Sequence, residues 1–293
     1  MVWLMNQAFF AQRPESTKAT RHWSAHLELG FRRGRQRTEL TQKKHLGPLR
    51  VQRLFYPDPN GRAHCYLLHP PGGVVLGDDL RVKVEVASGI ALLTTPSAGR
   101  FYTVADFREP QTQRVQLQAT AGLIEWLPQE TILFSGANAR LHTDIDLGAE
   151  AALAFWEILV LGRPAAGEAF ATGTCEQRLR IRRCGEPLLY DQLRLRAKDP
   201  IVNSPQGLRG ASTVGVATFT GGPHRDLLEH WLETVNGATL TGDFSVTQRR
   251  ELVIARYLGN DAMRCREGFS RLWRDVTEDR DGAQPSEPRI WHT

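Results

Sequence analysis

Several patterns that would reveal an activity are missing from this chain of 293 residues. It has only four cysteines and no C-x-x-C pair, which excludes a disulfide framework and the usual zinc-ribbon spacing. No lysine follows a glycine, so there is no phosphate-binding P-loop, and no G-x-S-x-G elbow marks a serine nucleophile. The residues alone therefore carry no signature of a nucleotide-hydrolysing enzyme or an α/β-hydrolase.

Long hydrophobic runs are also absent. The longest, residues 151–162, contains Glu157 and is well short of the roughly 20 apolar residues that a membrane helix needs. Before Arg13 there is no basic residue, and Asn6 and Gln7 interrupt the apolar residues, so the N-terminus does not have the pattern of a secretory signal. With few cysteines and no export signal, the sequence predicts a cytoplasmic protein without a membrane partner.

Lysine is scarce as well, with five lysines among the 37 basic residues, so 32 are arginines. The formal net charge is +5, and arginine pairs in bidentate fashion with carboxylates, which suits acidic protein partners as well as nucleic acid. Residues 31–37 concentrate four of these arginines without an aromatic residue between them. This run favours a solvent-exposed hairpin tip, and an RNA-binding β-module is the weaker alternative.

What the sequence does contain is alternation of apolar and polar residues with a period of two. Clear examples are residues 81–86, 115–118, 144–147, 178–182 and 193–196. Successive strand side chains point to opposite faces, so each run has one apolar and one wet face, as strands of antiparallel sheets do. Turn signals rich in glycine and proline separate the runs. The pattern predicts a mainly β fold of stacked antiparallel sheets.

Two late segments change to a helical period. Apolar residues at helical spacing predict helices near 225–235 and 261–274, with Asp261 as N-cap of the second. The 150s are ambiguous, because alanines favour helix and the following aliphatic run favours strand; we expect residues 152–161 to be buried. The predicted organisation is an N-terminal arm over 1–20, one β-rich domain over 21–276 and a C-terminal tail over 277–293.

Acidic residues in apolar surroundings are the main candidates for function. Glu125, Glu130, Glu157 and Glu168 each adjoin apolar or turn residues. A buried carboxylate without a partner costs several kcal/mol, so each either pairs with an arginine, faces solvent or lines a wet passage. Arginine pairing is the simplest interpretation. His64, Cys65 and His69 lack the spacing of a closed metal site and are expected to be structural.

Longer residue strings point to a family. They are His45–Gln52, Tyr66–Val75 before Gly77-Asp78, Leu93–Pro96, Glu125–Ile132, Trp156–Ile158 before Leu161–Glu168, and Pro288–Trp291. Together they resemble the urease accessory protein UreD family, called UreH in some organisms. The close matches run from about residue 45 to 173, in the order in which the family has them.

The resemblance implies a β-rich superhelical stack with two helices and a non-enzymatic role. Such a scaffold, or chaperone, docks on apo-urease with UreF and the GTPase UreG, while UreE brings nickel to the assembly. No cofactor is expected to be tightly bound, and Ni²⁺ would pass through an internal tunnel.

Four carboxylates in the resembling strings are candidates for a transient nickel path: Asp78, Glu125, Glu130 and Glu168. Carboxylate and water ligands on a wet wall would hold Ni²⁺ weakly enough to pass it on. The alternative from another class is a β-rich hydrolase or lyase that uses Glu130 and Glu168 as an acid/base pair.

Overall fold

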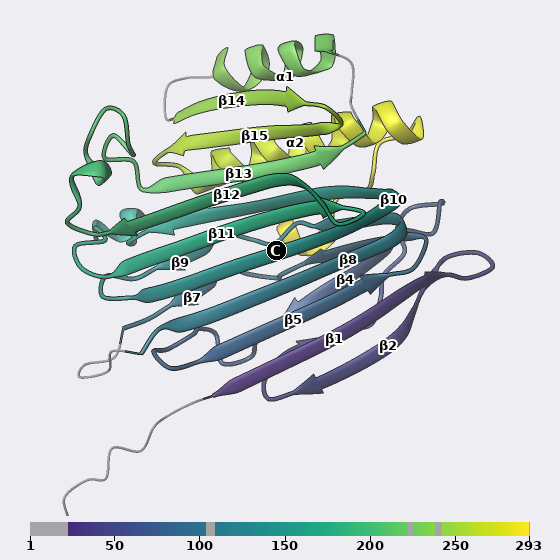
Figure 1. The fold of residues 1–293 in the computed structure, drawn as a ribbon, viewed down its shortest axis with the longest axis horizontal. Helices are drawn as coiled ribbons and strands as arrows, with labels where there is room; N and C mark the ends of the chain where they lie inside the picture. Colours follow the sequence, from purple (N-terminus) through teal and green to yellow (C-terminus); the bar gives the residue numbers. More distant parts are fainter. Residues whose placement is uncertain (1–22, 104–108, 222–224, 238–241, 293) are drawn as a thin grey trace, which may run out of the picture.

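The computed structural model describes residues 23–103, 109–221, 225–237 and 242–292, and the predicted N-terminal arm over 1–20 lies outside them. The chain is mainly β, with two α-helices late in the sequence (Figure 1). The strands in the first half are β1 (Ser24–Arg33), β2 (Thr38–Leu46), β3 (Arg50–Val51), β4 (Ala63–Leu68), β5 (Asp79–Val86), β6 (Ile90–Thr94), β7 (Gly99–Phe101), β8 (Gln111–Trp126) and β9 (Thr131–Leu133). The second half contains β10 (Asn138–Leu161), β11 (Thr174–Arg183), β12 (Glu186–Arg196), β13 (Thr213–Thr220), α1 (Arg225–Gly237), β14 (Gly242–Arg249), β15 (Leu252–Gly259) and α2 (Ala262–Asp281).

The two longest strands, β8 and β10, connect two sheet layers. Their first halves pair with each other, with β5 on one side and β11 on the other. Their second halves also pair, but with β6 next to β8, and β9 and β13 next to β10. The register shifts between Leu147 and Glu150, where the strands pass from one layer to the other. Gly122 has a positive φ of 87° here, and a Cβ would lie 2.2 Å from the Gly89 carbonyl oxygen.

The predicted mainly β class with two late helices is confirmed, but the sheet is mixed rather than antiparallel. The pairs β1–β5, β5–β8, β8–β10 and β10–β11 are all parallel. Parallel neighbours need a crossover connection, and here strands of the second layer, such as β6 and β7 between β5 and β8, supply it in place of helices. Alternation could not reveal this, because it records one wet face per strand and not the direction of the neighbouring strand.

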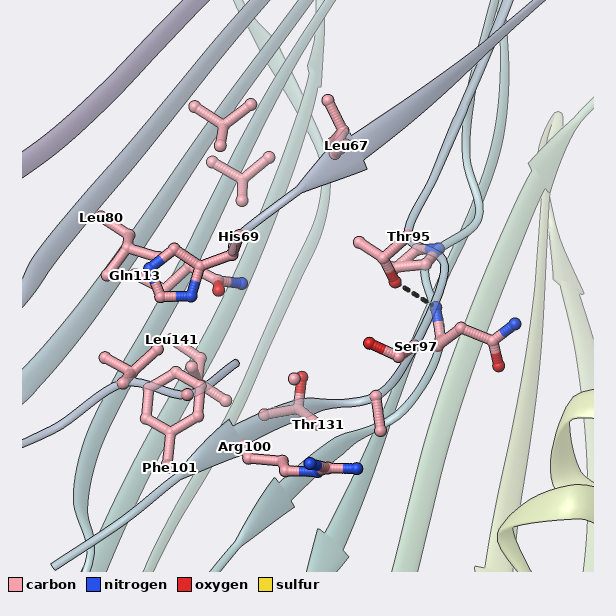
Figure 2. A pocket seen from close by; sticks show the side chains of 18 of the residues that line it. Leu67, His69, Leu80, Thr95, Ser97, Arg100, Phe101, Gln113, Thr131 and Leu141 are labelled. Atoms are coloured by element: carbon pink, nitrogen blue, oxygen red, sulfur yellow. Dashed lines mark hydrogen bonds between the residues drawn. The ribbon is translucent and has the colours of Figure 1, made fainter. Parts of the chain in front are cut away.

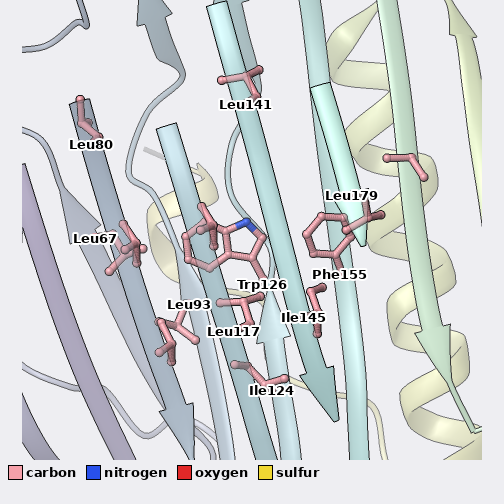
Figure 3. Close-up of a cluster of buried hydrophobic side chains, with 14 of the residues drawn as sticks. Leu67, Leu80, Leu93, Leu117, Ile124, Trp126, Leu141, Ile145, Phe155 and Leu179 are labelled. Atoms are coloured by element: carbon pink, nitrogen blue, oxygen red, sulfur yellow. The ribbon is translucent and has the colours of Figure 1, made fainter. Parts of the chain in front are cut away.

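The space between the two layers holds the larger apolar cluster (Figure 3). Leu80 on β5, Leu117 on β8 and Leu179 on β11 come from the first layer. Leu93 on β6 and Phe155 on β10 come from the second layer. Each fully buried side chain of this size contributes about 1.5–3 kcal/mol through removal from water. This cluster therefore holds the layers together.

A second cluster lies between the other face of the second layer and the helices. Trp156, Phe219 and Ala255 point from β10, β13 and β15 to this side, against Trp231 of α1 and Trp273 of α2. The second layer is thus buried on both faces. That explains why residues 153–161 read as a nearly continuous apolar run and form strand, which settles the helix–strand ambiguity of the 150s.

Both helices form where the sequence predicts them, and α2 runs past the predicted boundary to Asp281. The Asp261 side chain accepts a hydrogen bond from the Arg264 backbone N–H, so the predicted N-cap is confirmed. After α2, the chain returns to the second layer, where the Trp291 indole N–H donates to the Thr94 hydroxyl at 2.8 Å. The three-part division of the chain stays a prediction. Among the described residues, no helix is both long and apolar enough to span a bilayer.

Candidate functional site

A cavity of about 430 Å³ lies between the two layers, at one end of the larger apolar cluster. Leu80, Leu141 and Phe101 line its apolar wall, and His69 and Gln113 are among the polar groups that face it (Figure 2). A cavity of this size that is mostly apolar, with a few polar groups converging on it, has the character of a binding site or passage.

Glu157 is the acidic residue of this cavity. It lies in the second half of β10, on the same face as Phe155 and Leu159, so its side chain points to the space between the layers. The Thr143 hydroxyl donates to Oε1 at 2.5 Å, and the Gln177 side-chain amide donates to Oε2 at 2.7 Å. Both donors belong to the first layer, so Glu157 connects the two layers across the cavity.

The electrostatic surroundings of Glu157 differ from the arginine pairing that the sequence favoured. Among the described residues no arginine forms an ion pair with it, and its two hydrogen-bond donors are neutral. Burial raises the pKa of Glu157, and the hydrogen bonds from Thr143 and Gln177 offset only part of the rise. A carboxyl group whose ionisation is not balanced by a fixed cation can be balanced by a mobile one.

Asp78 lies near the same cavity without lining it. It is buried, and one carboxylate oxygen accepts the Val75 backbone N–H at 2.9 Å, which closes the turn before β5. His69 lines the cavity, and burial lowers its pKa while the charge of Asp78 acts in the opposite direction. A neutral imidazole beside a carboxylate is a competent donor pair for a divalent cation.

Glu125 lies on the opposite face of the second layer, away from the cavity. It is fully buried, the Arg62 Nη1 group donates to both of its carboxylate oxygens, and the Trp273 indole N–H donates to Oε1 at 2.8 Å. Asp58 joins the network, 3.4 Å from Arg62 and 3.2 Å from His64. Burial raises the pKa of Asp58, but the hydrogen bonds from His64 and Ser286 and the charge of Arg62 bring it below its usual value. Here the expected arginine pairing is confirmed.

Glu130 and Glu168 are paired with different arginines and neither lines the cavity. Arg266 of α2 lies 3.3 Å from Glu130. The Arg163 guanidinium donates to Glu168 at 2.8 Å across a half-exposed turn. The four carboxylates singled out in the sequence are therefore distributed over several environments. Within the described ranges, no group of three or more histidine, cysteine or acidic side chains forms a metal cluster.

His64 and Cys65 of β4 are fully buried, whereas His69, just after β4, lines the cavity. Cys65 is fully buried in the larger apolar cluster, and burial raises its pKa to about 12, which keeps the thiol protonated. His64 is buried beside Asp58. Neither His64 nor Cys65 lines the cavity. Of the three residues, only His69 does.

Sequence reasoning noted Glu157 but left it out of the candidate path, and it missed Gln177. The available signal was the position of a single acid in a run of strand residues buried on both sides. In that context a charged side chain needs a cavity or a partner. Gln177 had no such signal, because it is an ordinary polar position of an alternating strand and faces Glu157 only after β11 has paired with β10.

The fold and the cavity together define a class: a two-layered, helix-covered β protein with a mostly apolar cavity between its layers. Comparison with known proteins gives the family. The family model for the UreD urease accessory protein matches residues 24–292, and the chain belongs to this family.

Curated relatives agree with the family model. One is the urease accessory protein UreD of Saccharophagus degradans, 43% identical over 284 residues, which cover 96% of each chain. Another is UreD 2 of Brucella anthropi, 38% identical over 272 residues, with 92% of this chain and 98% of the relative covered. A third, UreD of Alkalilimnicola ehrlichii, is 39% identical over 282 residues, covering 96% of this chain and 95% of the relative.

Proposed function

We propose that the chain is a non-enzymatic scaffold, or chaperone, of urease maturation in the cytoplasm. It docks on the urease apoprotein together with UreF and UreG, and nickel that UreE carries reaches urease through this assembly. Membership of the UreD family supports the role. The missing P-loop agrees with it, because the energy of nucleotide hydrolysis must then come from another chain.

We further propose that the cavity is part of the route of the nickel ion, with Glu157 as its main weak ligand. The support is the position of Glu157: a half-buried carboxyl group, without an arginine partner among the described residues, in a cavity that His69 also lines. Asp78 assists from beside His69, and Glu130 lies next to the cavity residue Gln129. Glu125 and Glu168, the other two candidates from the sequence, lie outside the cavity and pair with Arg62 and Arg163, so they are weaker candidates for the path. One or two oxygen ligands hold Ni²⁺ weakly, which suits passage rather than storage.

The test is nickel delivery by variants that keep the fold. Glu157→Gln retains the shape of the side chain and removes its charge; its amide oxygen can still accept from Gln177, and its amide N–H can donate to the Thr143 hydroxyl oxygen. Glu150→Gln is the matched control, because Glu150 is an exposed acid on the same strand, β10. Each variant is produced with urease and its accessory proteins. The bound nickel of the purified complex is measured by mass spectrometry, and urease activity is measured beside it.

Glu157→Gln is expected to leave assembly intact and to lower nickel content and urease activity together, whereas Glu150→Gln leaves both unchanged. Asp78→Ala and Glu168→Ala are measured in the same series. Full nickel loading with all three path variants would remove the cavity from the route. Failure of the wild-type chain to associate with the urease apoprotein would refute the accessory role itself.

A further inference from the structure

Positive charge is concentrated at one end of the molecule. Residues 32–53, which form the end of β1, all of β2 and the segment after it, contain eight arginines and lysines and one acid, Glu39. This segment alone carries more positive charge than the formal net charge of +5 for the whole chain. The rest of the protein is therefore slightly acidic.

Several arginines elsewhere on the sheet are paired with carboxylates. On the outer face of β10 and β11, Arg178 and Arg180 both pair with Asp144, and Arg182 pairs with Asp146 at 2.7 Å. At the β1–β2 hairpin the situation differs. Five exposed arginines, which we call the arginine tip, have no carboxylate partner within 4 Å among the described residues: Arg32, Arg33, Arg35, Arg37 and Arg53.

The arginine tip is held in place by the segment that follows β3. The Arg37 guanidinium lies 4.3 Å from the centre of the Tyr56 ring, and the Tyr56 hydroxyl donates to the Thr38 carbonyl at 2.9 Å. The Arg53 guanidinium lies 5.2 Å from the centre of the Phe55 ring, and Arg33 donates to the Asn60 carbonyl at 2.5 Å. These contacts order the cations before any partner arrives, which lowers the entropic cost of binding.

Two features favour a protein partner over a nucleic acid. Phe55 and Tyr56 are only half-exposed, and arginines lie against their rings, so the tip offers no free aromatic face on which a base could stack. At Thr38 the outer edge of β2 is occupied by Gly61 and Tyr56, but β2 pairs with β1 alone among the strands that the structure describes, which leaves the rest of this backbone edge open to an extended peptide. Lys43 and Lys44 continue the positive charge along that edge.

We infer that the arginine tip and the adjacent edge of β2 form a docking surface for an acidic, extended segment of a partner protein. Carboxylates of that segment pair with the arginine tip, and its backbone follows β2. This inference rests on the proposed function in one respect: an accessory protein needs surfaces for the proteins with which it assembles.

The test measures binding of a short fluorescein-labelled peptide that alternates glutamate and threonine, by fluorescence anisotropy at low and at physiological salt. The test variant is Arg32→Gln/Arg35→Gln, because these two side chains form no hydrogen bond, ion pair or ring contact with the described residues and their loss should not disturb the fold. The matched control is Arg196→Gln/Arg249→Gln. These two exposed arginines are far in sequence from the arginine tip and have no carboxylate partner among the described residues. A labelled oligouridylate serves as the competing probe.

The test variant is expected to lower peptide affinity roughly fivefold, and the control to change it by less than about twofold. Equal loss in both variants would mean that net charge alone attracts the peptide and would overturn the docking surface. Tighter binding of oligouridylate, with the same dependence on the arginine tip, would overturn the assignment to a protein partner.

A second experiment measures how well the wild type, the test variant and the control variant each capture the urease apoprotein. It separates this inference from the proposed function. If the wild type captures the apoprotein but peptide affinity is the same for the wild type and the test variant, the docking surface is refuted and the accessory role stands. If peptide binding depends on the tip while the wild type does not capture the apoprotein, the accessory role fails and the docking surface stands.

Discussion

Two carboxylates on neighbouring strands of the second layer, one fully buried and one half-buried, have opposite surroundings. Glu125 on β8 faces the helices and is neutralised by the Arg62 guanidinium, with a further hydrogen bond from Trp273. Glu157 on β10 faces the cavity between the layers and is bound only by neutral Thr143 and Gln177. The first arrangement joins parts of the chain 63 residues apart. The second leaves a carboxyl group that no arginine among the described residues neutralises.

The largest effect should come from breaking the Glu125 pair. Replacing Glu125 by alanine removes the nearest carboxylate of the buried Arg62 guanidinium, leaves only Asp58 at 3.4 Å and Asp281 at 3.5 Å, and should lower the free energy of unfolding by about 3–5 kcal/mol. Urea unfolding followed by circular dichroism measures this. The double variant Arg62→Met/Glu125→Leu should recover much of the loss, because it removes both charges. A loss below about 1 kcal/mol for the single variant would show that the pair is not a structural element.

A smaller and pH-dependent effect is expected at Glu157. Its pKa is raised in the folded state above the usual 4.5, so its contribution to stability is fully present below that value and is lost as the pH rises through the folded pKa. The stability of the wild type relative to Glu157→Gln should therefore fall with rising pH.

The opposite pH dependence is expected at Asp58, because its pKa is lowered in the folded state. The stability of the wild type relative to Asp58→Asn should fall as the pH drops.

Unfolding curves of the three proteins at several pH values check both signs. Parallel pH profiles for wild type and Glu157→Gln would contradict the contrast between the two carboxylates. They would mean that the carboxyl group at Glu157 titrates as it does in the unfolded chain.

The smallest effect is expected at Glu168. Its ion pair with Arg163 is about half exposed, and such pairs contribute little because water screens them, so Glu168→Ala should change the free energy of unfolding by less than about 1 kcal/mol. Thermal unfolding of the purified chain measures this. Because stability is preserved, any loss of nickel delivery by this variant would report on the path and not on the fold. A large drop in melting temperature would instead make Glu168 a structural residue.

The sequence predicts the local features of this protein better than the non-local ones. The two helices, the Asp261 N-cap and the burial of most of residues 152–161 follow from patterns within a few residues, and all are confirmed. The cavity residues do not follow from such patterns. Gln177 and Glu157 are 20 residues apart and meet only because β10 bends from one layer into the other beside β11.

By itself, the sequence determined the mainly β class, the position of the helices and the family, because period, capping residues and long motif strings are local properties of the chain. Only the tertiary structure decided that the strands pair largely in parallel across two layers, and which acid is neutralised by an arginine. Glu125 and Glu157 both stand in apolar strings, and nothing in those strings distinguishes them. The difference arises because Arg62 lies on the helix-covered side of the second layer, whereas the side that Glu157 faces holds a cavity and no arginine that pairs with it among the described residues.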